Sequence, residues 1–342
     1  MKVLVTGATG FLGGPLVERL LAQGERDLRI TVRPGSNRAR VQAAAARYPD
    51  ARLEYVPANL TVPAEVARAV EGADAVYHLA ASLRGAAADM FLNTVVGSKY
   101  LLDAIGPRRT RTILISSFSV YGVAGLGRGA LVDESTPLEP HPEKRDLYAH
   151  VKLREELLFR ERAARDGIPL VILRPGVIYG PGGGAFSTRV GLNLFGLFLA
   201  LGGDNRLPLS YVDNCADAIA LAGRTAPVSN EPAVYNLVDD DLPTCREYLA
   251  AYQAQVAPVR AVPVPYPLLA LGARLLERYN RWSRGQLPAI FTPYKVASTW
   301  GGNRFDNAKI KGLGWRQPVP TEEGLRRAFA WLRDQAATTG AR

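Results

Sequence analysis

The stretch VTGATGFLG, from Val5 to Gly13, sets three glycines at intervals of three residues near the start of the chain. It follows a short β-rich run and precedes residues 11–23, whose leucines recur with helical spacing. In such a loop Gly7 permits a tight turn off the strand, Gly10 lets backbone amides approach a pyrophosphate, and Gly13 lets the helix pack closely on the sheet. The amides and the positive dipole of the helix N-terminus also favour a phosphate. The predicted dinucleotide-binding residues of this loop are Gly7, Thr9, Gly10, Phe11, Leu12 and Gly13.

Outward from this loop, β-rich runs alternate with segments of helical periodicity. The predicted strands are residues 3–7, 28–32, 53–56, 75–79, 112–115 and 170–173. The predicted helices are residues 11–23, 63–70, 87–105 and 148–165. Strands that alternate with helices form a parallel sheet with helices on both faces. The sequence therefore predicts an α/β fold built on a Rossmann-type doubly wound parallel sheet.

The composition of the sequence changes after Gly180, where glycine and proline become frequent and the regular alternation of strands and helices is lost. The elements predicted beyond this point are a strand at residues 234–238 and helices at residues 213–222, 268–278 and 322–335. We interpret this part as a smaller C-terminal region that caps the carboxyl edge of the sheet. The expected division is a dinucleotide-binding domain at residues 1–175 and a mainly substrate-binding region at residues 176–342, with some segments returning to the core.

The composition is that of a globular protein, with 342 residues of which 47% are hydrophobic and 22% charged. The net charge of +10 permits anionic ligands, but no nucleic-acid motif accompanies it, so nucleic acid is not an expected partner. The two cysteines, Cys215 and Cys245, lack metal-ligand spacing and are predicted to be buried thiols, and no metal site is expected. Neither a signal peptide nor a membrane span is predicted, because the longest apolar run covers only residues 192–201. The expected location is the cytoplasm.

The motif TGxxGxxG at the N-terminus resembles the short-chain dehydrogenase/reductase superfamily. The chain length and the later motifs resemble its extended branch, the NAD-dependent epimerase/dehydratase family, nearer to hydroxysteroid dehydrogenases and flavonoid-type reductases. The resemblance covers residues 1–240 and, less clearly, residues 303–331. It implies an enzyme that transfers a hydride with a nicotinamide cofactor and acts on a small molecule.

The end of the second predicted strand bears on the choice between NAD and NADP. An acid at this position binds the free ribose hydroxyls, whereas an arginine accepts the 2′-phosphate. In ITVRPGSNRAR the strand ends on Arg33, and Ser36 and Arg38 lie close behind. A planar guanidinium forms paired, charge-assisted hydrogen bonds with phosphate. The sequence therefore favours NADP(H), with the alternative that Arg33 stacks on adenine while NAD(H) binds.

Other cofactor contacts are implied by the resemblance. Asn59, in PANLT, stands where relatives often carry an aspartate that touches adenine. The strand end HLAA flanks the cofactor in relatives, and we interpret its His78 as a structural residue. Asn93 matches an asparagine that helps to hold the central helix and the active site. The full set of expected contacts outside the glycine loop is Arg33, Ser36, Arg38, Asn59, Leu60, Leu79, Ala80, Ala81, Asn93, Tyr148, Lys152, Pro175, Gly176 and Val177.

Two further motifs predict the catalytic residues. In ILISSFSVYG a strand ends and Ser117 follows, at the position where relatives bind the reacting carbonyl or alcohol oxygen. In YAHVK, Tyr148 and Lys152 are four residues apart and so share a helix face. A phenol titrates near pH ~10, and a nearby ammonium favours the phenolate that can act as a base. We therefore predict that Tyr148 exchanges the proton, Lys152 supplies the charge and holds the nicotinamide ribose, and Ser117 orients the oxygen.

Three departures from the nucleotide-sugar pattern bear on the substrate. Dehydratases of the family place acids after the active-site hydroxyl, where this chain has Phe118 and Ser119. To hold the diphosphate, sugar enzymes often carry an asparagine where this chain has Pro175 and Gly176, and an arginine where it has Pro208. The pattern favours a ketoreductase or hydroxy-dehydrogenase.

Two alternatives stay open. The first is a nucleotide-sugar epimerase with tightly bound NAD, because Arg189, Arg206 or Arg304 could reach a diphosphate. The second is a non-catalytic cofactor-sensing protein, which is disfavoured because such proteins commonly lose the tyrosine or the lysine.

The expected partners follow from two observations. The segment PYPLLALGARLLERYNRWSRG, residues 265–285, is apolar on one side and rich in arginine on the other. It could lie weakly on a membrane surface or roof an apolar pocket, although a helix packed on the core is the favoured interpretation. Relatives suggest a homodimer formed through the helices at residues 87–105 and 148–165.

Overall fold

A seven-stranded sheet forms the centre of the molecule in the computed structural model, which describes residues 1–194, 196–227, 229, 231–283 and 291–340. Its strand order is β12-β7-β5-β4-β1-β2-β3, and every neighbouring pair is parallel. The strands are β1 (Lys2–Thr6), β2 (Asp27–Val32), β3 (Arg52–Pro57), β4 (Ala75–His78), β5 (Arg111–Ile115), β7 (Leu170–Pro175) and β12 (Ala233–Leu237). The order reverses between β1 and β4, which is the switch point of a doubly wound sheet. The predicted α/β fold is therefore confirmed.

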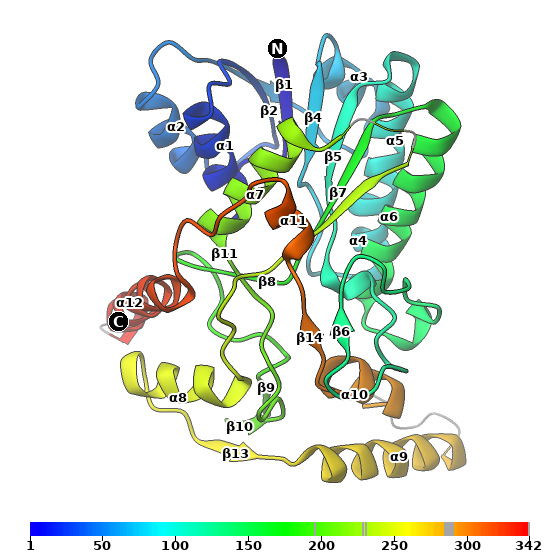
Figure 1. Cartoon of the computed structure of the whole chain (residues 1–342), viewed down its shortest axis with the longest axis vertical. Coiled ribbons are helices and arrows are strands. Elements are labelled where there is room, and N and C mark those ends of the chain that lie inside the picture. Colours follow the sequence, from blue (N-terminus) through cyan, green and yellow to red (C-terminus); the bar gives the residue numbers. More distant parts are fainter. Residues whose placement is uncertain (195, 228, 230, 284–290, 341–342) are drawn as a thin grey trace.

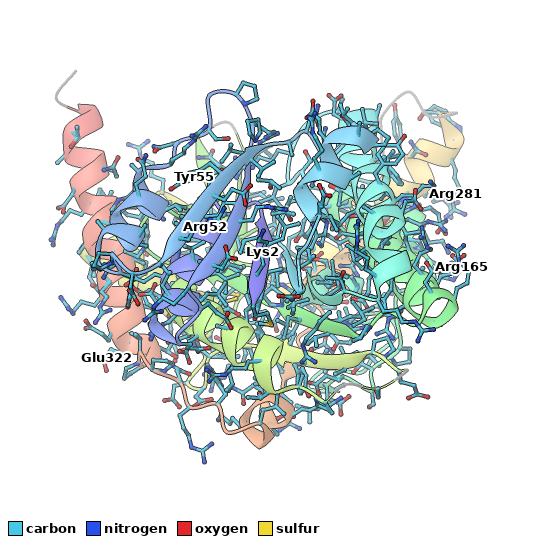
Figure 2. The ribbon with its side chains drawn as sticks, turned by 90° about the horizontal axis from the view of Figure 1, so that it is seen from above. Lys2, Arg52, Tyr55, Arg165, Arg281 and Glu322 are labelled. Atoms are coloured by element: carbon cyan, nitrogen blue, oxygen red, sulfur yellow. The ribbon has the colours of Figure 1, made fainter. Side chains whose placement is uncertain are left out.

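Helices cover both faces of this sheet because successive strand residues point to opposite sides. Val3 and Val5 belong to one buried cluster, together with α1, α2 and α7, whereas Leu4 belongs to a second cluster with α3, α5 and α6. The helices concerned are α1 (Gly13–Ala22), α2 (Ala39–Ala46), α3 (Pro63–Val70), α5 (Gly97–Ile105), α6 (Leu147–Asp166) and α7 (Val212–Thr225). Seen from above, Lys2 lies near the middle, with Arg165 of α6 and Glu322 of the C-terminal helix on opposite sides (Figure 2).

The helix predicted at residues 87–105 differs from the expectation. It consists of α4 (Ala87–Phe91), a π-helical turn (Leu92–Val96) and α5. A π-turn adds a residue to the helical period and so changes which side chains face inward. Thr94 and Ser98 are both completely buried here. Thr94 accepts a hydrogen bond from the amide of Ser82, which follows β4, and Ser98 bonds to His78 at the end of β4.

The C-terminal region lies below the carboxyl ends of the sheet strands (Figure 1). Its small sheets pair β8 (Val177–Tyr179) with β11 (Leu209–Tyr211), β10 (Leu197–Ala200) with β9 (Gly191–Leu194) and β13 (Ala261–Pro263), and β6 (Leu131–Val132) with β14 (Arg304–Phe305). Its helices are α8 (Cys245–Gln255), α9 (Tyr266–Trp282), α10 (Pro293–Trp300), α11 (Ala308–Gly312) and α12 (Thr321–Gly340). The strand β12 and the helix α7 come from the second half of the chain but pack in the central layers.

Both cysteines are free and buried, as the sequence predicts, and burial raises the pKa of the Cys245 thiol to about 12. Within the described ranges, no helix combines the length and the apolar character needed to cross a bilayer.

Candidate active site

The predicted cofactor and catalytic residues lie at one edge of the sheet. Gly7 follows β1, Arg33 follows β2 and Asn59 lies just past β3. Leu79 follows β4, Ser117 comes two residues after β5, and Pro175 ends β7. Because the strands are parallel, these six strand ends share the carboxyl edge, which is where doubly wound sheets bind ligands.

The glycine loop has the geometry that its sequence predicts. Gly7 has a φ of 73°, and a Cβ atom on it would lie 2.8 Å from the backbone nitrogen of Ala80. The loops after β1 and β4 therefore touch at the switch point. A Cβ on Gly13 would lie 2.4 Å from both the Cα of Ala8 and the carbonyl oxygen of Gly7, so a side chain there would separate α1 from the loop.

The start of α1 fits a dinucleotide pyrophosphate. Gly10 is exposed, and a Cβ on it would meet only the carbonyl oxygen of Gly7, at 3.2 Å. The first turn of α1 contains no acidic residue, and no side chain caps it. Its amides and its positive dipole are therefore available to a phosphate. Phe11 borders the same place, and a Cβ atom on Gly183 would lie 3.0 Å from its ring.

The segment after β2 presents three arginines. Arg33 is exposed, and its backbone nitrogen donates to Ser36 Oγ at 3.0 Å, which fixes the turn. The Arg38 guanidinium lies 5.1 Å from the ring centre of Tyr55. Arg40 packs against Gly14 in the first turn of α1 and donates to the carbonyl oxygen of Pro181 at 3.0 Å. Arg40, two residues after Arg38, thus also lies at this end of β2.

The two asparagines expected near the cofactor are both bonded locally. The Oδ1 of Asn59 accepts from the amide and the hydroxyl of Thr61, at 3.1 and 2.9 Å. Asn93 donates its side-chain amide to the carbonyl oxygen of Asp89 at 2.7 Å, within the same helical segment. Among the described residues, Asn93 forms no hydrogen bond with the catalytic candidates, and Thr94 beside it makes the link to Ser82 instead, at 2.9 Å.

Ser117 lies in the turn between β5 and a short 3-10 helix, Phe118–Val120. Its Oγ accepts from the Ser119 amide at 3.1 Å and donates to the Ser119 hydroxyl at 3.2 Å. The 3-10 helix packs against α6, the helix that carries the other two candidates.

The helix α6 begins where Asp146 accepts a hydrogen bond from the Ala149 amide at 3.0 Å. This cap places Tyr148 in the first turn and Lys152 one turn further along. Tyr148 is partly exposed, whereas Lys152 is buried. Lys152 Nζ donates to the carbonyl oxygen of Ile115, at the end of β5, at 2.7 Å. The lysine of YAHVK and the serine of ILISSFSVYG are thereby brought to the same strand end.

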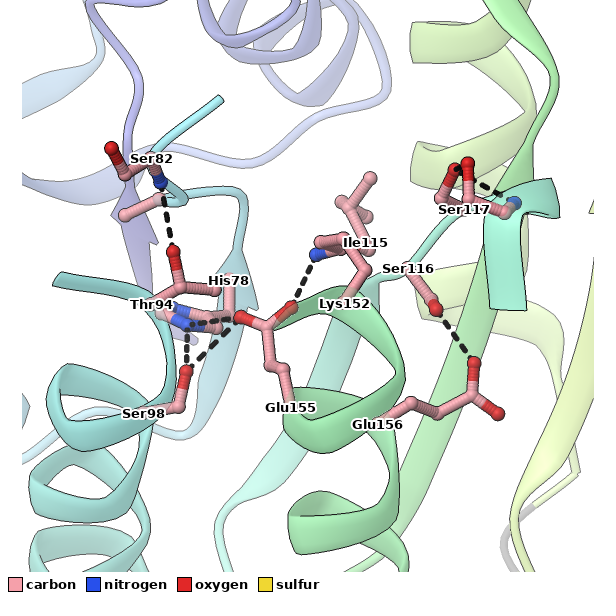
Figure 3. Close-up of polar contacts among 12 residues, drawn as sticks. His78, Ser82, Thr94, Ser98, Ile115, Ser116, Ser117, Lys152, Glu155 and Glu156 are labelled. Atoms are coloured by element: carbon pink, nitrogen blue, oxygen red, sulfur yellow. Dashed lines mark hydrogen bonds and ion pairs between the residues drawn. The ribbon is translucent and has the colours of Figure 1, made fainter. Parts of the chain in front are cut away.

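A buried polar network extends inward from Lys152 (Figure 3). Its ammonium pairs with Glu155, whose other oxygen accepts from Ser98 Oγ at 3.1 Å. His78 bonds to Ser98 Oγ at 3.0 Å and to Thr6 Oγ1 at 2.7 Å. Burial alone would raise the pKa of Glu155, but the charge of Lys152 and the hydrogen-bonding ring of His78 hold it below its ordinary value. His78 is thus buried with both ring nitrogens bonded, which is consistent with a structural role, and Glu155 offsets much of the charge of Lys152.

The next residue of α6, Glu156, is completely buried and points the other way, toward Ser116 (Figure 3). It accepts from Ser116 Oγ at 2.6 Å and from the Nη2 of Arg174 at 2.5 Å. The Arg174 guanidinium also lies 4.5 Å from the ring centre of Tyr121. These contacts fix α6 to β5 and β7 beside the candidate catalytic turn.

The C-terminal region borders this turn through Phe305, whose ring stacks on Phe118 with the ring centres 5.4 Å apart. Beyond Phe305 lies an open cleft of about 530 Å³, lined in part by Arg206 and Arg304. Arg206 donates to the carbonyl oxygen of Leu242 at 2.6 Å. Three carboxylates also line the cleft: Asp240, Asp241 and Glu247.

The guanidinium of Arg189 lies 5.7 Å from the ring centre of Phe305, and Arg189 lines a small pocket with Phe305 and Arg206. In the described part of the chain, no carboxylate pairs with it, and it reaches only the carbonyl oxygen of Thr299, at 3.4 Å. Burial and the charge of Arg145 lower the pKa of Arg189 to about 10. Arg189 therefore carries a positive charge that forms no ion pair with a described carboxylate.

Sequence reasoning missed Ser98, Glu155, Glu156 and Arg174, all of which are buried. One signal was available, because residues 155 and 156 follow Lys152 by three and four positions and so lie one turn away from it on the helix. Charged residues on the buried face of a helix require partners. The partners themselves lie on other elements and could not be identified from spacing.

Comparisons with known proteins agree with this arrangement. The model of the family described as the NAD dependent epimerase/dehydratase family matches residues 3–237. The protein YbjS of Escherichia coli K12 is 29% identical over 98% of this chain and 98% of its own. The 3beta-hydroxysteroid-dehydrogenase/decarboxylase isoform 1 of Arabidopsis thaliana is 25% identical over 97% of this chain and 80% of its own.

Among solved structures, the UDP-glucose 4-epimerase of Thermus thermophilus in complex with NAD matches with a TM-score of 0.68. It is 23% identical, and the match covers 97% of this chain and 99% of that one. At this identity the likeness shows the fold.

Proposed function

The chain belongs to the NAD-dependent epimerase/dehydratase family, and on this premise we propose that it is an NAD(P)-dependent oxidoreductase acting at a carbonyl or secondary alcohol. The name of the Arabidopsis relative, a hydroxysteroid dehydrogenase, supports a net redox reaction. The proposed catalytic residues are Ser117, Tyr148 and Lys152. A nicotinamide cofactor bound along the carboxyl edge of the sheet would give or take the hydride.

The observation that carries this proposal is the hydrogen bond from Lys152 Nζ to the carbonyl oxygen of Ile115. It holds the first turns of α6 against the strand end that Ser117 follows. An ammonium has three donors, and Ile115 and Glu155 occupy two of them, so one N–H remains for a ribose or for Tyr148.

The proposed proton chemistry uses this chain's own side chains. The Tyr148 hydroxyl would give a proton to the substrate oxygen during reduction and take it back during oxidation. Ser117 would release its weak 3.2 Å bond to Ser119 and orient the substrate oxygen instead. Phe118 and Phe305 would exclude water from one side of this oxygen, because their stacked rings border the turn.

Two sequence features that disfavour a sugar diphosphate meet at one point of the structure. A Cβ on Gly176 would lie 2.2 Å from the carbonyl oxygen of Pro208, and the Val177 amide donates to that same oxygen at 2.6 Å. Near these positions many nucleotide-sugar enzymes carry an asparagine, and often an arginine. In this chain a hydrogen bond between two backbone groups occupies this place, with no side chain there to hold a diphosphate. This supports a ketoreductase or hydroxy-dehydrogenase.

A second candidate function, a nucleotide-sugar epimerase with retained NAD, is favoured by one observation. Arg189 has no carboxylate partner among the described residues and could hold a diphosphate. The carboxylates Asp240, Asp241 and Glu247 along the neighbouring cleft oppose this, because they would repel the same group. A non-catalytic sensor is disfavoured because Tyr148 and Lys152 are both present.

The nucleotide that the purified protein releases on denaturation tests the proposal. We expect little bound nucleotide, and tighter binding of NADPH than of NADH by the protein in titrations. An enzyme with net turnover exchanges its cofactor in every cycle, whereas an epimerase completes a closed cycle with one cofactor. Stoichiometric release of NAD would contradict the proposal and support the epimerase.

Replacing Arg33 by aspartate should reverse the cofactor preference. We expect NADPH to bind roughly tenfold to a hundredfold more weakly, because a charge-assisted hydrogen bond to the 2′-phosphate is lost and a negative charge is added. Binding of NADH should change little or improve. The measurement is fluorescence titration with both cofactors, and Arg333→Asp on the exposed side of α12 serves as the charge-matched control. Unchanged constants for both cofactors would refute the assignment of Arg33.

A homodimer through α4–α5 and α6 is also proposed. Leu92 of the π-turn and Leu157 of α6 are large apolar side chains that these helices leave exposed. A second copy would remove them from water.

A further inference from the structure

The helix α9 packs on the rest of the protein along a narrow strip of its surface. Ala273 is its only buried residue among those described, and it joins a small cluster with Leu201, Val296 and Trp300. The structure therefore contradicts the favoured interpretation of residues 265–285 as a helix packed on the core by its apolar face. Residues 284 and 285 of that segment lie outside the described residues.

The apolar face of α9 points into solvent. Its exposed side chains recur every three or four residues, which places them in one stripe along the helix. The stripe consists of Leu268, Leu271, Leu275, Tyr279 and Trp282. The exposed fractions are 61% for Leu268, 59% for Leu275 and 78% for Trp282. The stripe runs along nearly the whole length of this helix of 17 residues, which is about 25 Å long.

Neighbouring strands extend the same surface. Leu276 lies beside the stripe, Tyr266 is exposed at the start of α9, and Leu194, Leu197 and Val262 are exposed on β9, β10 and β13. Ten of the sixteen large apolar side chains found exposed in the described part of the chain thus belong to residues 191–200 and 261–282. Figure 1 shows these strands and α9 together at the end of the molecule opposite the N-terminus. We call this set of ten side chains the α9 surface.

The charges beside the stripe are mainly positive. Arg274, Arg278 and Arg281 are exposed on α9, and Figure 2 shows Arg281 at the outer edge of the molecule. The one acidic residue of the helix, Glu277, pairs with Arg281 at 3.4 Å. The whole chain carries a net charge of +10. An apolar stripe with arginines alongside is the pattern of helices that lie in a bilayer interface and attract anionic lipids.

From this geometry we propose that the α9 surface docks the protein on an anionic lipid bilayer, with α9 lying in the plane of the interface. A second copy of the chain fits less well. Two stripes packed against each other would bring the arginines of both copies together, and like charges across an interface oppose association. A bilayer with acidic headgroups takes up both the apolar stripe and the arginines. This inference is independent of the proposed reaction.

Binding to vesicles tests the proposal directly. The full chain is mixed with vesicles of phosphatidylcholine and phosphatidylglycerol, or of phosphatidylcholine alone, and the bound fraction is measured by sedimentation. We expect binding to the anionic vesicles, weaker binding to the neutral ones, and a decrease with added salt. Absence of binding to either kind of vesicle would overturn the proposal.

Two variants separate the apolar contribution from the ionic one. Leu271→Glu/Leu275→Glu should lower the partition coefficient more than tenfold on both kinds of vesicle, because two leucines no longer enter the interface. Arg274→Gln/Arg278→Gln should lower binding only to anionic vesicles. Leu131→Glu, at an exposed leucine of β6, is the matched control and should bind like the wild type. Turnover should be unchanged in all of them.

Trp282 reports on the location of the contact. Trp300 and Trp315 are buried, and Trp331 is half-buried on α12, away from the stripe. A brominated phosphatidylcholine should therefore quench mainly Trp282 when the protein binds, and Trp282→Phe should remove most of that quenching. This readout remains decisive if the double glutamate variant folds poorly. If the wild type proves to be a dimer that Leu271→Glu/Leu275→Glu dissociates, the α9 surface is a self-interface and the bilayer proposal is wrong.

Discussion

Replacing Tyr148 by phenylalanine should lower turnover by about 10²–10⁴-fold while cofactor binding stays the same. The hydroxyl is the group proposed to exchange a proton with the substrate oxygen, and general acid–base groups contribute rate factors of about this size. The side chain is partly exposed, and its hydroxyl forms no hydrogen bond with any other described residue. Its removal should therefore leave the fold intact.

The measurement is steady-state turnover on a panel of apolar ketones and secondary alcohols, with cofactor affinity determined by titration. Tyr252→Phe is the matched control, because Tyr252 of α8 is half-buried and contacts Phe186 well away from α6. We expect that control to retain wild-type turnover. Wild-type turnover in Tyr148→Phe would remove Tyr148 from the mechanism. A chain that binds cofactor but turns over no substrate in either form would support the sensing alternative.

The sequence predicts the central sheet well because its signals are local. The strands of the parallel sheet are short runs rich in apolar residues. Gly7, Gly10 and Gly13 lie within one stretch of nine residues, and each is required there for its own steric reason. The parallel order then brings all strand ends to one edge, so the approximate position of the site follows from the fold. Gly13 shows how local the signal of the glycine loop is, because a Cβ atom on it would meet backbone atoms of its own loop.

The contacts that fix the site depend on residues far apart in the chain. Lys152 bonds to Ile115, and Glu155 reaches Ser98, so neither partner is visible in the spacing YAHVK. The π-turn is equally hidden, since no residue of Leu92–Val96 is specific to a π-turn. The exposure of α9 was also wrongly anticipated, because an apolar stripe has the same periodicity whether it faces a core or a bilayer.

The second large effect should come from Glu156→Gln, which we expect to lower the free energy of unfolding by about 3–5 kcal/mol. Glutamine has nearly the same shape but carries no charge, so the fully buried Arg174 guanidinium loses its counter-ion. Among the described residues, only the Tyr121 ring would then remain to stabilise this charge, and the Nη1 atom of Arg174 is already buried without a partner. A loss of this size is a large part of the total stability of a typical domain.

Urea unfolding of the variant and of Glu161→Gln measures this effect. Glu161 is exposed on the same helix, and its replacement should change stability by less than about 0.5 kcal/mol. Glu156→Gln/Arg174→Met should recover part of the loss, because the unpaired charge is then absent. If Glu156→Gln is as stable as the wild type, Arg174 is compensated in another way and the pair does not fix α6.

The pH dependence gives an independent check on the same pair. Burial would raise the pKa of Glu156, but Arg174 and Ser116 hold it below its ordinary value of 4.5. A carboxyl with a lowered pKa in the folded state stabilises the protein fully above its unfolded pKa and loses that contribution as the pH falls through the folded value. The stability difference between wild type and Glu156→Gln should therefore be constant near neutral pH and shrink as the pH drops below about 4.5. A difference that stays constant down to acidic pH would mean that packing, and not the ion pair, holds α6 against β7.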